Sequence, residues 1–263
     1  MLWSSVFVFV LAFANSYSKT VVPDFITPCE VKDKKCIGEG WTQAVQNLAT
    51  GSTEINLPIL DPLRLEGIDI DIPGTVHLKF NGTLKGLKGC IFDKVGVDFS
   101  KGSVSQVLDL RCNITIKGNY NVDVNSSSLF GGIGGNGIEG LIKADGVGKV
   151  KLEKLKLKMM LDLNLVRDDD KEVKMVLKDG PVGYKYKIGG PVVFQGNNIF
   201  VADQDISALV IGFMNSNWQV VMNVFGGYFF DDAMLRIGDF IREFYKVVPP
   251  RALFTDNLDE FYP

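Results

Sequence analysis

The stretch 216–248, SNWQVVMNVFGGYFFDDAMLRIGDFIREFYKVV, decides how the rest of the chain is organised. Its apolar residues recur at steps of three and four, which predicts one long amphipathic helix. Ser216-Asn-Trp-Gln219 predicts a capping box at its start, and Pro249-Pro250 ends it. An unbroken helix of this length spans roughly 45 Å, and its polar side makes it unsuitable for crossing a membrane. A long apolar surface elsewhere in the chain must therefore cover the apolar stripe.

Two adjacent glycines, Gly226 and Gly227, lie in the middle of this predicted helix. Each costs about 1 kcal/mol relative to alanine in a helix interior. One interpretation is a tolerated kink. The other is that the missing side chain leaves room for a bound molecule or lets a strand approach closely. The sequence leaves both interpretations open.

The region from Ile68 to Phe200 alternates apolar and polar residues in one segment after another. In the clearest segment, Lys149–Val166, the apolar residues change parity at Glu153-Lys154, which predicts a bulge there. Turns rich in Gly, Asn and Asp separate the segments. Long strands with one polar face predict an antiparallel sheet that is apolar on one side, and bulges predict that it curves. Such a sheet and the long helix would bury each other, so we expect an α+β fold in which the sheet wraps the helix.

Two shorter segments precede the strands. Residues Gly40–Leu48 predict a short helix with Trp41 on its apolar side. The stretch Leu57–Leu65 contains two prolines, which excludes a helix and predicts an extended connection to the sheet.

The start of the chain is typical of an exported protein. Residues 1–18 contain an apolar run too short to span a bilayer, which predicts a signal peptide and a single mature domain over 19–263. Glycosylation sequons at Asn81, Asn113 and Asn125 independently favour secretion. The net charge is −3 with lysines and acids interspersed, which gives no basic footprint for nucleic acid. We expect no membrane-spanning segment after cleavage of the signal peptide.

The cysteines fit an oxidising compartment. They are Cys29, Cys36, Cys90 and Cys112. The first two are close enough to close a small N-terminal loop. The second two stand on either side of Ser100–Ser103, a predicted hairpin turn that brings them opposite each other. The apolar parities of the two strands disagree, because Ile91 and Val95 are odd whereas Leu108 is even, so this pairing requires a bulge between Gly89 and Asp93.

Several segments, in a fixed order, carry a family resemblance. They are Cys29-x6-Cys36, the short helix after it, Leu60-Asp-Pro-Leu-Arg-Leu65, Ile68-Asp-Ile70, Asn198-Ile-Phe200, Met214-Asn-Ser-Asn-Trp218 and Leu258-Asp-Glu-Phe-Tyr-Pro263. Together they resemble insect takeout proteins and haemolymph juvenile hormone-binding proteins over nearly the whole mature chain. The resemblance implies a long C-terminal helix wrapped by a highly curved antiparallel sheet, related to tubular lipid-binding domains. Cys90 and Cys112 match neither group, so hormone specificity is not carried over.

The resemblance also implies a secreted haemolymph carrier of hydrophobic ligands such as juvenile hormone, other terpenoids or fatty-acid-like lipids, and it associates the chain with circadian regulation. We expect a monomer that needs no cofactor and binds its ligand in a tunnel between helix and sheet. Each candidate lining residue can equally be plain core. The candidates are Trp41, Tyr184, Tyr186, Trp218, Met222, Phe225 and Phe229. The main alternative is a glycoprotein with a filled core that acts through its surface on a receptor or pathogen.

Enzyme chemistry finds little support in the sequence. The single histidine, His77, lies on the polar face of a predicted strand, so no histidine-based triad and no metal cluster can be assembled without it. The segment Gly132–Gly137 fits G-x-G-x-x-G, but a strand rather than a helix follows it, so we interpret it as a loop. The acidic run Asp168-Asp-Asp170 could bind calcium, but a charged hairpin turn is the better interpretation. A lipid-modifying enzyme that depends on His77 is the third possibility.

Overall fold

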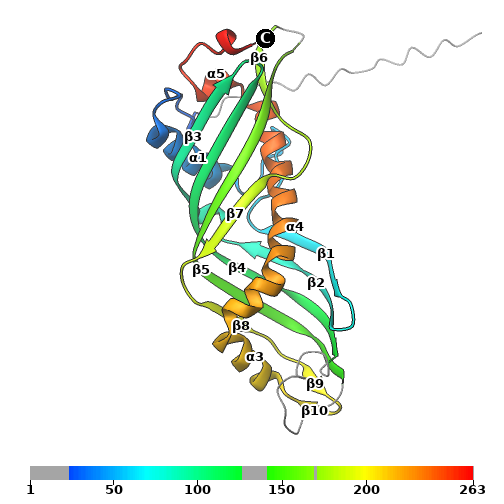
Figure 1. Cartoon of the computed structure of the whole chain (residues 1–263). Helices are drawn as coiled ribbons and strands as arrows, with labels where there is room; N and C mark the ends of the chain where they lie inside the picture. The colour runs from blue at the N-terminus through cyan, green and yellow to red at the C-terminus, as the bar shows by residue number, and fades with distance from the viewer. Residues whose placement is uncertain (1–23, 126–140, 169–170, 263) are drawn as a thin grey trace, which may run out of the picture.

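The protein is described by a computed structural model that covers residues 24–125, 141–168 and 171–262 (Figure 1). The predicted signal peptide, the Gly132–Gly137 segment and the side chain of Asn125 lie outside the described residues. The helices are α1 (Lys34–Leu48), α3 (Ser207–Ser216), α4 (Trp218–Val247) and α5 (Pro250–Leu253), with 3-10 turns at Leu87–Gly89 and Leu258–Phe261. The strands are β1 (Leu63–Ile72), β2 (Val76–Lys85), β3 (Ile91–Ser100), β4 (Ser103–Asn125), β5 (Leu141–Arg167), β6 (Val173–Leu177), β7 (Gly183–Ile188), β8 (Val192–Gln195), β9 (Ile199–Val201) and β10 (Gln204–Asp205).

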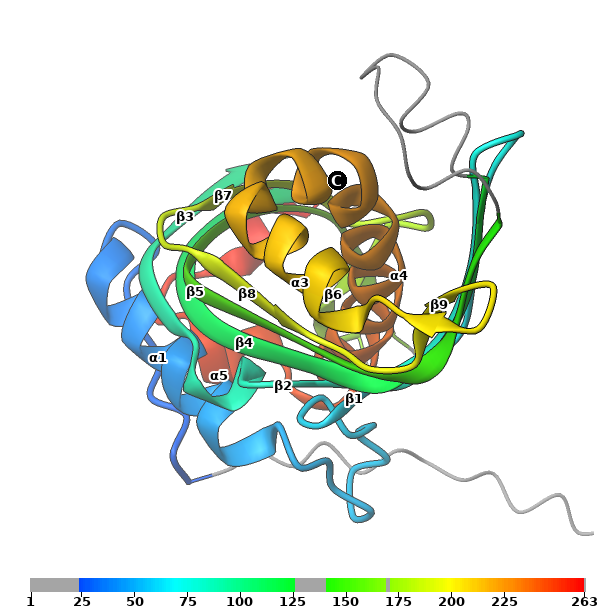
Figure 2. The same ribbon diagram turned by 90° about the horizontal axis from the view of Figure 1, so that it is seen from below.

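The strands form one antiparallel sheet built around the long strands β4 and β5. Strands β3 and β2 pair with successive stretches of β4, and β1 extends the sheet beyond β2. On the other side, β6, β7, β8 and β9 pair in turn with β5. The sheet is a crescent in cross-section, with α3 and α4 on its concave side (Figure 2). This confirms the predicted α+β fold with a curved sheet around a long C-terminal helix.

Two β-bulges are each filled by an asparagine side chain. At the bulge predicted for Glu153-Lys154, the pairing of β4 with β5 shifts, and Asn113 Oδ1 accepts a hydrogen bond from the Lys154 backbone N at 2.8 Å. In the β1–β2 pair, Asn81 Oδ1 accepts from the Gly67 backbone N at 2.7 Å. Lys154 and Gly67 both have positive φ, at 54° and 74°. The amide oxygens therefore satisfy N–H groups that the ladders leave unpaired.

Both predicted disulfides are present, Cys29–Cys36 and Cys90–Cys112. Ser100 pairs with Ser103 at the predicted hairpin turn, and the bulge falls at Asp93. One expectation was wrong in detail. Ile91 is 43% exposed, and Phe92 takes the inward position, because the bulge reverses the parity of β3 before Val95.

The helix boundaries differ from those predicted. Ser216 is the last residue of α3, and no side chain caps α4, so the predicted capping box does not form. Helix α3 was missed because its residues are almost all uncharged and apolar, which leaves no polar face to reveal a period. Helix α1 starts at Lys34 instead of Gly40, because the Asp33 carboxylate accepts from the backbone N of Lys35 and Cys36.

We expect Asn113→Ala to lower the free energy of unfolding by about 1 kcal/mol, because the Lys154 N–H loses its acceptor. Urea unfolding of protein produced without glycans would measure this. The matched control is Thr115→Val, which deletes the same sequon but leaves the asparagine and the strand propensity in place. Equal stability of Asn113→Ala and the wild type would contradict a structural role for this amide.

A candidate ligand site between helix and sheet

The burial of α4 changes along its length. Every buried residue of this helix lies at Gly226 or beyond, and α3 has none. Trp218, Met222 and Phe225 continue the same apolar stripe but remain half-buried. We call residues Trp218–Phe225 the open half of α4 and Gly226–Val247 its closed half. The helix is thus packed tightly against the sheet at one end and loosely at the other.

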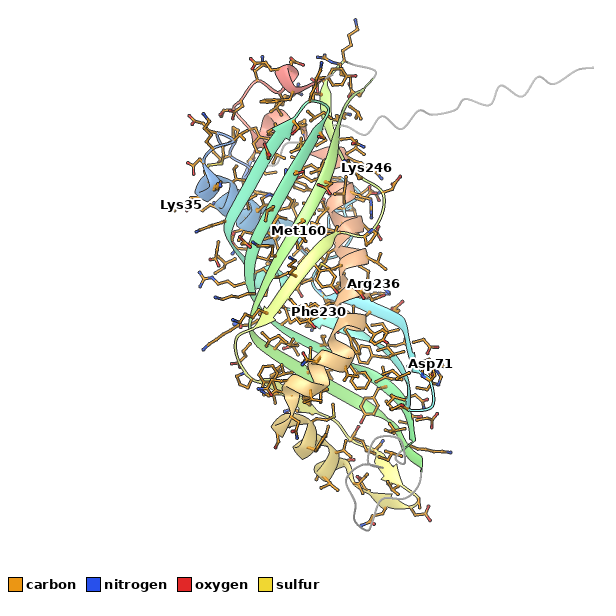
Figure 3. All side chains as sticks on the ribbon, viewed as in Figure 1. Lys35, Asp71, Met160, Phe230, Arg236 and Lys246 are labelled. Atoms are coloured by element: carbon orange, nitrogen blue, oxygen red, sulfur yellow. A yellow bond between two sulfur atoms is a disulfide. The ribbon has the colours of Figure 1, made fainter. Side chains whose placement is uncertain are left out.

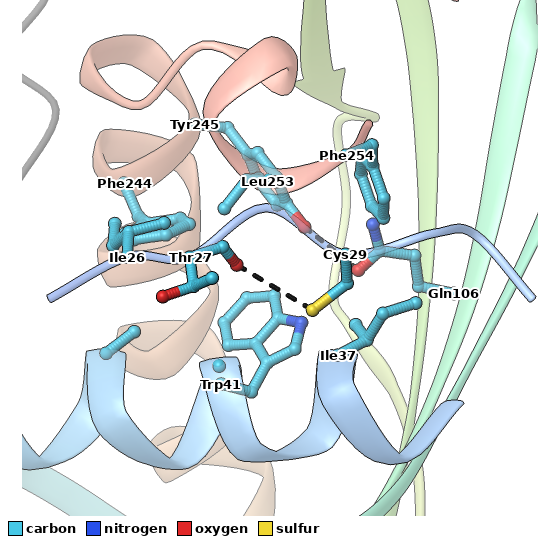
Figure 4. Close-up of a pocket in the computed structure, with 12 residues that line it drawn as sticks. Ile26, Thr27, Cys29, Ile37, Trp41, Gln106, Phe244, Tyr245, Leu253 and Phe254 are labelled. Carbon is cyan, nitrogen blue, oxygen red and sulfur yellow. Dashed lines mark hydrogen bonds between the residues drawn. The ribbon is translucent and has the colours of Figure 1, made fainter. Parts of the chain in front are cut away.

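The closed half contains a small hollow beneath α1 (Figure 4). Its volume is about 30 Å³, which is room for one water molecule but not for a terpenoid or fatty acid. The ring of Trp41 packs there on Phe92 and Phe244, with centroids 5.8 and 5.5 Å away. Trp41 is therefore surrounded by core aromatic residues.

A polar pair is buried beside this hollow. Tyr245 Oη donates to Gln106 Oε1 at 2.9 Å, and both residues are almost fully buried. Among the described residues, Gln106 Nε2 has no hydrogen-bond partner. Burial raises the pKa of Tyr245 well above its usual value, so the hydroxyl stays protonated and donates. The unpaired amide is a donor that a bound water or a ligand oxygen would satisfy.

Apolar residues of the open half and of the strands are incompletely buried. Trp218, Val221 and Met222 pack against the core from the helix side while remaining half-buried. Leu78, Tyr120, Val150 and Ile188 do the same from the strands. Further burial of these apolar side chains would be favourable.

An aromatic stack separates the two halves. Phe230 lies on the sheet-facing side of α4 near the middle of the molecule (Figure 3). Its ring stacks on Tyr186 at 4.1 Å between centroids, and Tyr184 lies beside Tyr186 at 6.3 Å. Tyr184 Oη donates to Asp231 Oδ1 at 2.6 Å. Partial burial and this carboxylate raise the pKa of Tyr184, so its hydroxyl is a donor at any physiological pH.

Gly226 leaves room for the end of the Tyr186 side chain, which reaches α4 from β7. A Cβ atom on Gly226 would lie 2.9 Å from both Tyr186 Oη and Met222 Cε, whereas a Cβ on Gly227 would meet nothing within 4 Å. The space that the missing side chain leaves at Gly226 is therefore occupied by side chains, that of Tyr186 from β7 and that of Met222 from α4 itself. Helix α4 continues through both glycines.

The structure brings some of the candidate residues together and separates others. Tyr186 and Met222 lie beside Gly226, and Tyr184 lies beside Tyr186. Trp218 and Phe225 share the helix stripe of Met222. Phe229 packs edge-on against Phe80 of β2, at 5.4 Å between centroids. Trp41 contacts Phe244, which is roughly 40 Å along α4 from Trp218. Trp41 therefore does not share a site with Trp218.

Two residues of this region were missed from the sequence. Phe230 directly follows the predicted Phe229 but occupies the central position in the stack. Gln106 stands between the inward-facing Val104 and Leu108 of β4. A polar residue at an inward position of a strand is a signal that could have identified it.

The remaining candidate groups, His77 and Asp168, lie on the surface of the sheet and in a turn. His77 is partly exposed on β2, with Nε2 2.9 Å from Asp69 Oδ1. Asp168 belongs to a turn in which it forms an ion pair with Lys174 at 2.7 Å. No group of three or more His, Cys, Asp or Glu side chains is positioned to hold a metal in the described ranges. A second hollow, of about 310 Å³, has a mostly polar rim between β6 and α5 that includes Arg167 and Arg251.

Comparisons with known proteins agree with the fold. The sequence pattern of the family described as Haemolymph juvenile hormone binding protein (JHBP) matches residues 6–255. The crystal structure of Epiphyas postvittana Takeout 1 is similar with a TM-score of 0.74 and 23% identity, covering 88% of this chain and 100% of that chain. A lipopolysaccharide binding protein matches at a TM-score of 0.36 and 10% identity over 80% of this chain and 38% of its own, which is too weak to establish a shared fold. No curated protein matches the sequence.

Alanine substitution should affect the free energy of unfolding differently at the two glycines of α4. Gly227→Ala should raise the free energy of unfolding by about 0.5–1 kcal/mol, because the helix gains propensity and the new methyl meets nothing. Gly226→Ala gains the same propensity but must displace the stacked Tyr186 ring, so we expect it to be less stable than Gly227→Ala by at least about 1 kcal/mol. Urea unfolding of both variants measures the difference, and equal stabilisation would show that β7 does not press on α4.

Tyr245→Phe should lower the free energy of unfolding by about 1–3 kcal/mol, because it leaves both ends of the buried Gln106 amide unpaired. The double variant Tyr245→Phe with Gln106→Leu removes both partners and should recover most of the loss.

The single variant Tyr245→Phe also tests how the free energy of unfolding depends on pH. The folded-state pKa of Tyr245 is raised above the unfolded value of about 10, so its stabilising contribution is complete below that pH and is lost as pH rises further. Unfolding curves at several alkaline pH values should show that the free energy of unfolding falls less steeply with pH in Tyr245→Phe than in the wild type. An unchanged slope would mean that Tyr245 ionises freely in the folded protein.

Proposed function

Because the chain belongs to the haemolymph juvenile hormone binding protein family, we propose that it is a secreted carrier that reversibly binds a small hydrophobic ligand between α4 and the sheet. The observation that carries the proposal is the set of half-buried apolar residues on the open half of α4 and on the strands. The ligand classes that suit such a lining are juvenile hormone, other terpenoids and fatty-acid-like lipids. Secretion into haemolymph, action as a monomer and a circadian association belong to the same proposal.

The binding energy would come mainly from burial of the ligand's apolar surface. Each Å² removed from water contributes about 25 cal/mol, less the cost of the motion that the ligand loses. Tyr186 supplies a polar contact, because its hydroxyl has no hydrogen-bond partner among the described residues and lies beside Gly226. Partial burial raises the pKa of Tyr186, which keeps this hydroxyl a donor for an ester, epoxide or carboxylate oxygen.

Glycosylation fits the geometry of two of the three sequons. Asn81 and Asn113 are exposed, and each uses only its Oδ1 atom in the bulge. A glycan on Nδ2 would therefore leave both bulge contacts intact. Both disulfides suit an extracellular protein. The described residues contain no helix of the length and apolarity that a bilayer crossing demands.

A second function is favoured by one observation. The hollow in the closed half holds only about 30 Å³, far less than the few hundred Å³ that enclose a small ligand. A filled core would suit a secreted glycoprotein that acts through its outer surface on a receptor or a pathogen. This alternative requires the open half to close without a ligand, whereas the carrier requires it to close around one.

A fluorescent fatty-acid probe should bind the purified protein and be displaced by juvenile hormone or a related terpenoid. Phe225→Ala removes apolar contact from the open half and should weaken probe binding about tenfold. Val224→Ala, next to it on the exposed side of the same helix, is the matched control and should leave binding unchanged. A fluorescence titration measures both.

The alternatives give different results in the same titration. A probe that does not bind, or that no lipid displaces, would favour the surface-acting glycoprotein. Weakened binding in Trp41→Leu, with Phe225→Ala unaffected, would move the site to the hollow beneath α1.

A further inference from the structure

The end of the molecule formed by α3 and the start of α4 is uncharged and apolar. Residues 206–230 contain no Asp, Glu, Lys or Arg. Five large apolar or aromatic side chains in this segment are exposed. They are Leu209 (62%), Phe213 (54%), Val220 (60%), Val224 (47%) and Tyr228 (45%). Because α3 has no buried residue, these side chains contribute little to holding the fold together.

The exposed residues form two ridges. Leu209 and Phe213 are four residues apart on α3, and Val220, Val224 and Tyr228 follow the same spacing on α4, so each set lies on one face of its helix. The two helices contact each other, and Figure 1 shows α3 and the start of α4 at the same end of the molecule. The ridges therefore belong to one surface, which we call the apolar end.

The apolar end is continuous with the proposed ligand site. Ile211, Met214 and Trp218 are half-buried and pack towards the core from the same two helices. One side of α3 and early α4 thus packs towards the core while the other side is exposed. In the proposed carrier, a ligand that reaches the open half would pass these helices.

We propose that the apolar end docks on the interfacial region of a lipid bilayer, so that a hydrophobic ligand passes between the membrane and the proposed ligand site without crossing water. The inference rests on the proposed carrier function. Insertion of the ridges removes apolar area from water, and no charge has to be desolvated. Ser216, Gln219 and Asn223 are uncharged hydrogen-bonding side chains that suit the headgroup level. A second copy of the chain is a poorer occupant, because it would cover the route by which a ligand reaches the proposed site.

The lysine-rich outer face of the sheet is the alternative membrane-contacting surface, and it leads to a different expected result. Lys156 stands opposite Lys187, and Lys158 opposite Lys185, across the β5–β7 pair. A contact made by these lysines would require anionic lipid and weaken with salt. Docking by the uncharged apolar end requires neither. Lipid composition and salt therefore identify which face meets the membrane.

The first test is cosedimentation of the full protein with phosphatidylcholine vesicles at low and high salt. We expect binding at both salt concentrations, weakened at least about tenfold in the double variant Leu209→Glu with Phe213→Glu. Leu235→Glu is the matched control. Leu235 is 53% exposed on the same helix but lies beyond the uncharged segment, so binding should stay within about twofold. Thermal unfolding monitors folding, and Val220→Ser with Val224→Ser replaces the first pair if that pair melts early.

The second test separates this inference from the carrier function. The double variant should bind the fluorescent fatty acid in vesicle-free buffer within about twofold of the wild type, but take it from vesicles about tenfold more slowly. Failure of both proteins to bind the probe would refute the carrier function. Normal probe binding with no vesicle association would overturn only the membrane inference.

Three further outcomes would also overturn the membrane inference. They are a transfer rate that does not depend on vesicle concentration, association that needs anionic lipid and is abolished by salt, and dimerisation that the same substitutions abolish.

Discussion

The structure depends on α4 filling the gap left by a sheet that does not close. Strand β1 is one edge of the sheet, and β6 and β7 lie along the other side of β5. Helix α4 is hydrogen-bonded to the sheet on both sides of the gap. The Arg236 guanidinium donates to the Glu66 carbonyl of β1 at 3.0 Å, and Arg242 donates to the Gly180 carbonyl between β6 and β7 at 2.7 Å. The charged side of the helix thus closes the crescent while its apolar stripe forms the core.

This arrangement explains why the two ends of the molecule differ. Both arginines lie in the closed half, where the helix residues facing the sheet are buried. The segment 206–230 contains no charged residue that could make the same contacts. The part of α4 that has charged side chains is hydrogen-bonded to the sheet and closely packed on it. The uncharged part lacks such bonds among the described residues and is less buried. Tight packing and a loosely packed apolar lining therefore coexist in one layer of structure.

Much of the fold could be predicted because side chains alternate strictly along a strand. A change of parity at Glu153-Lys154 had to mean a bulge, and the mismatch between Cys90 and Cys112 had to mean another, near Asp93. The start of α4 could not be predicted in the same way. Ser216 has the right sequence for a cap, but the preceding apolar residues continue as α3 and use it as their last residue. The capping preference of Ser216 is therefore overridden, because the preceding residues form a helix that ends at Ser216.

The candidate site was predicted less completely, because periodicity identifies the face of a helix but not the part of the sheet opposite it. The stripe placed Trp218, Met222 and Phe225 on one face of the helix, where they are half-buried. It could not show that Trp41 contacts Phe244 at the far end of α4. Nor could it show that Phe230 meets Tyr186, because that contact depends on β7 pairing with β5 at one particular register.

The stack of Phe230 on Tyr186 also sets a length scale. It lies across the space between helix and sheet, roughly 18 Å along α4 from Trp218. In the proposed site, a rod-shaped ligand that enters past Trp218 would meet these aromatic rings at that depth. Such a site would select molecules by their length rather than by their headgroup. Gly226 bears on this length, since a side chain at that position would press on the Tyr186 hydroxyl.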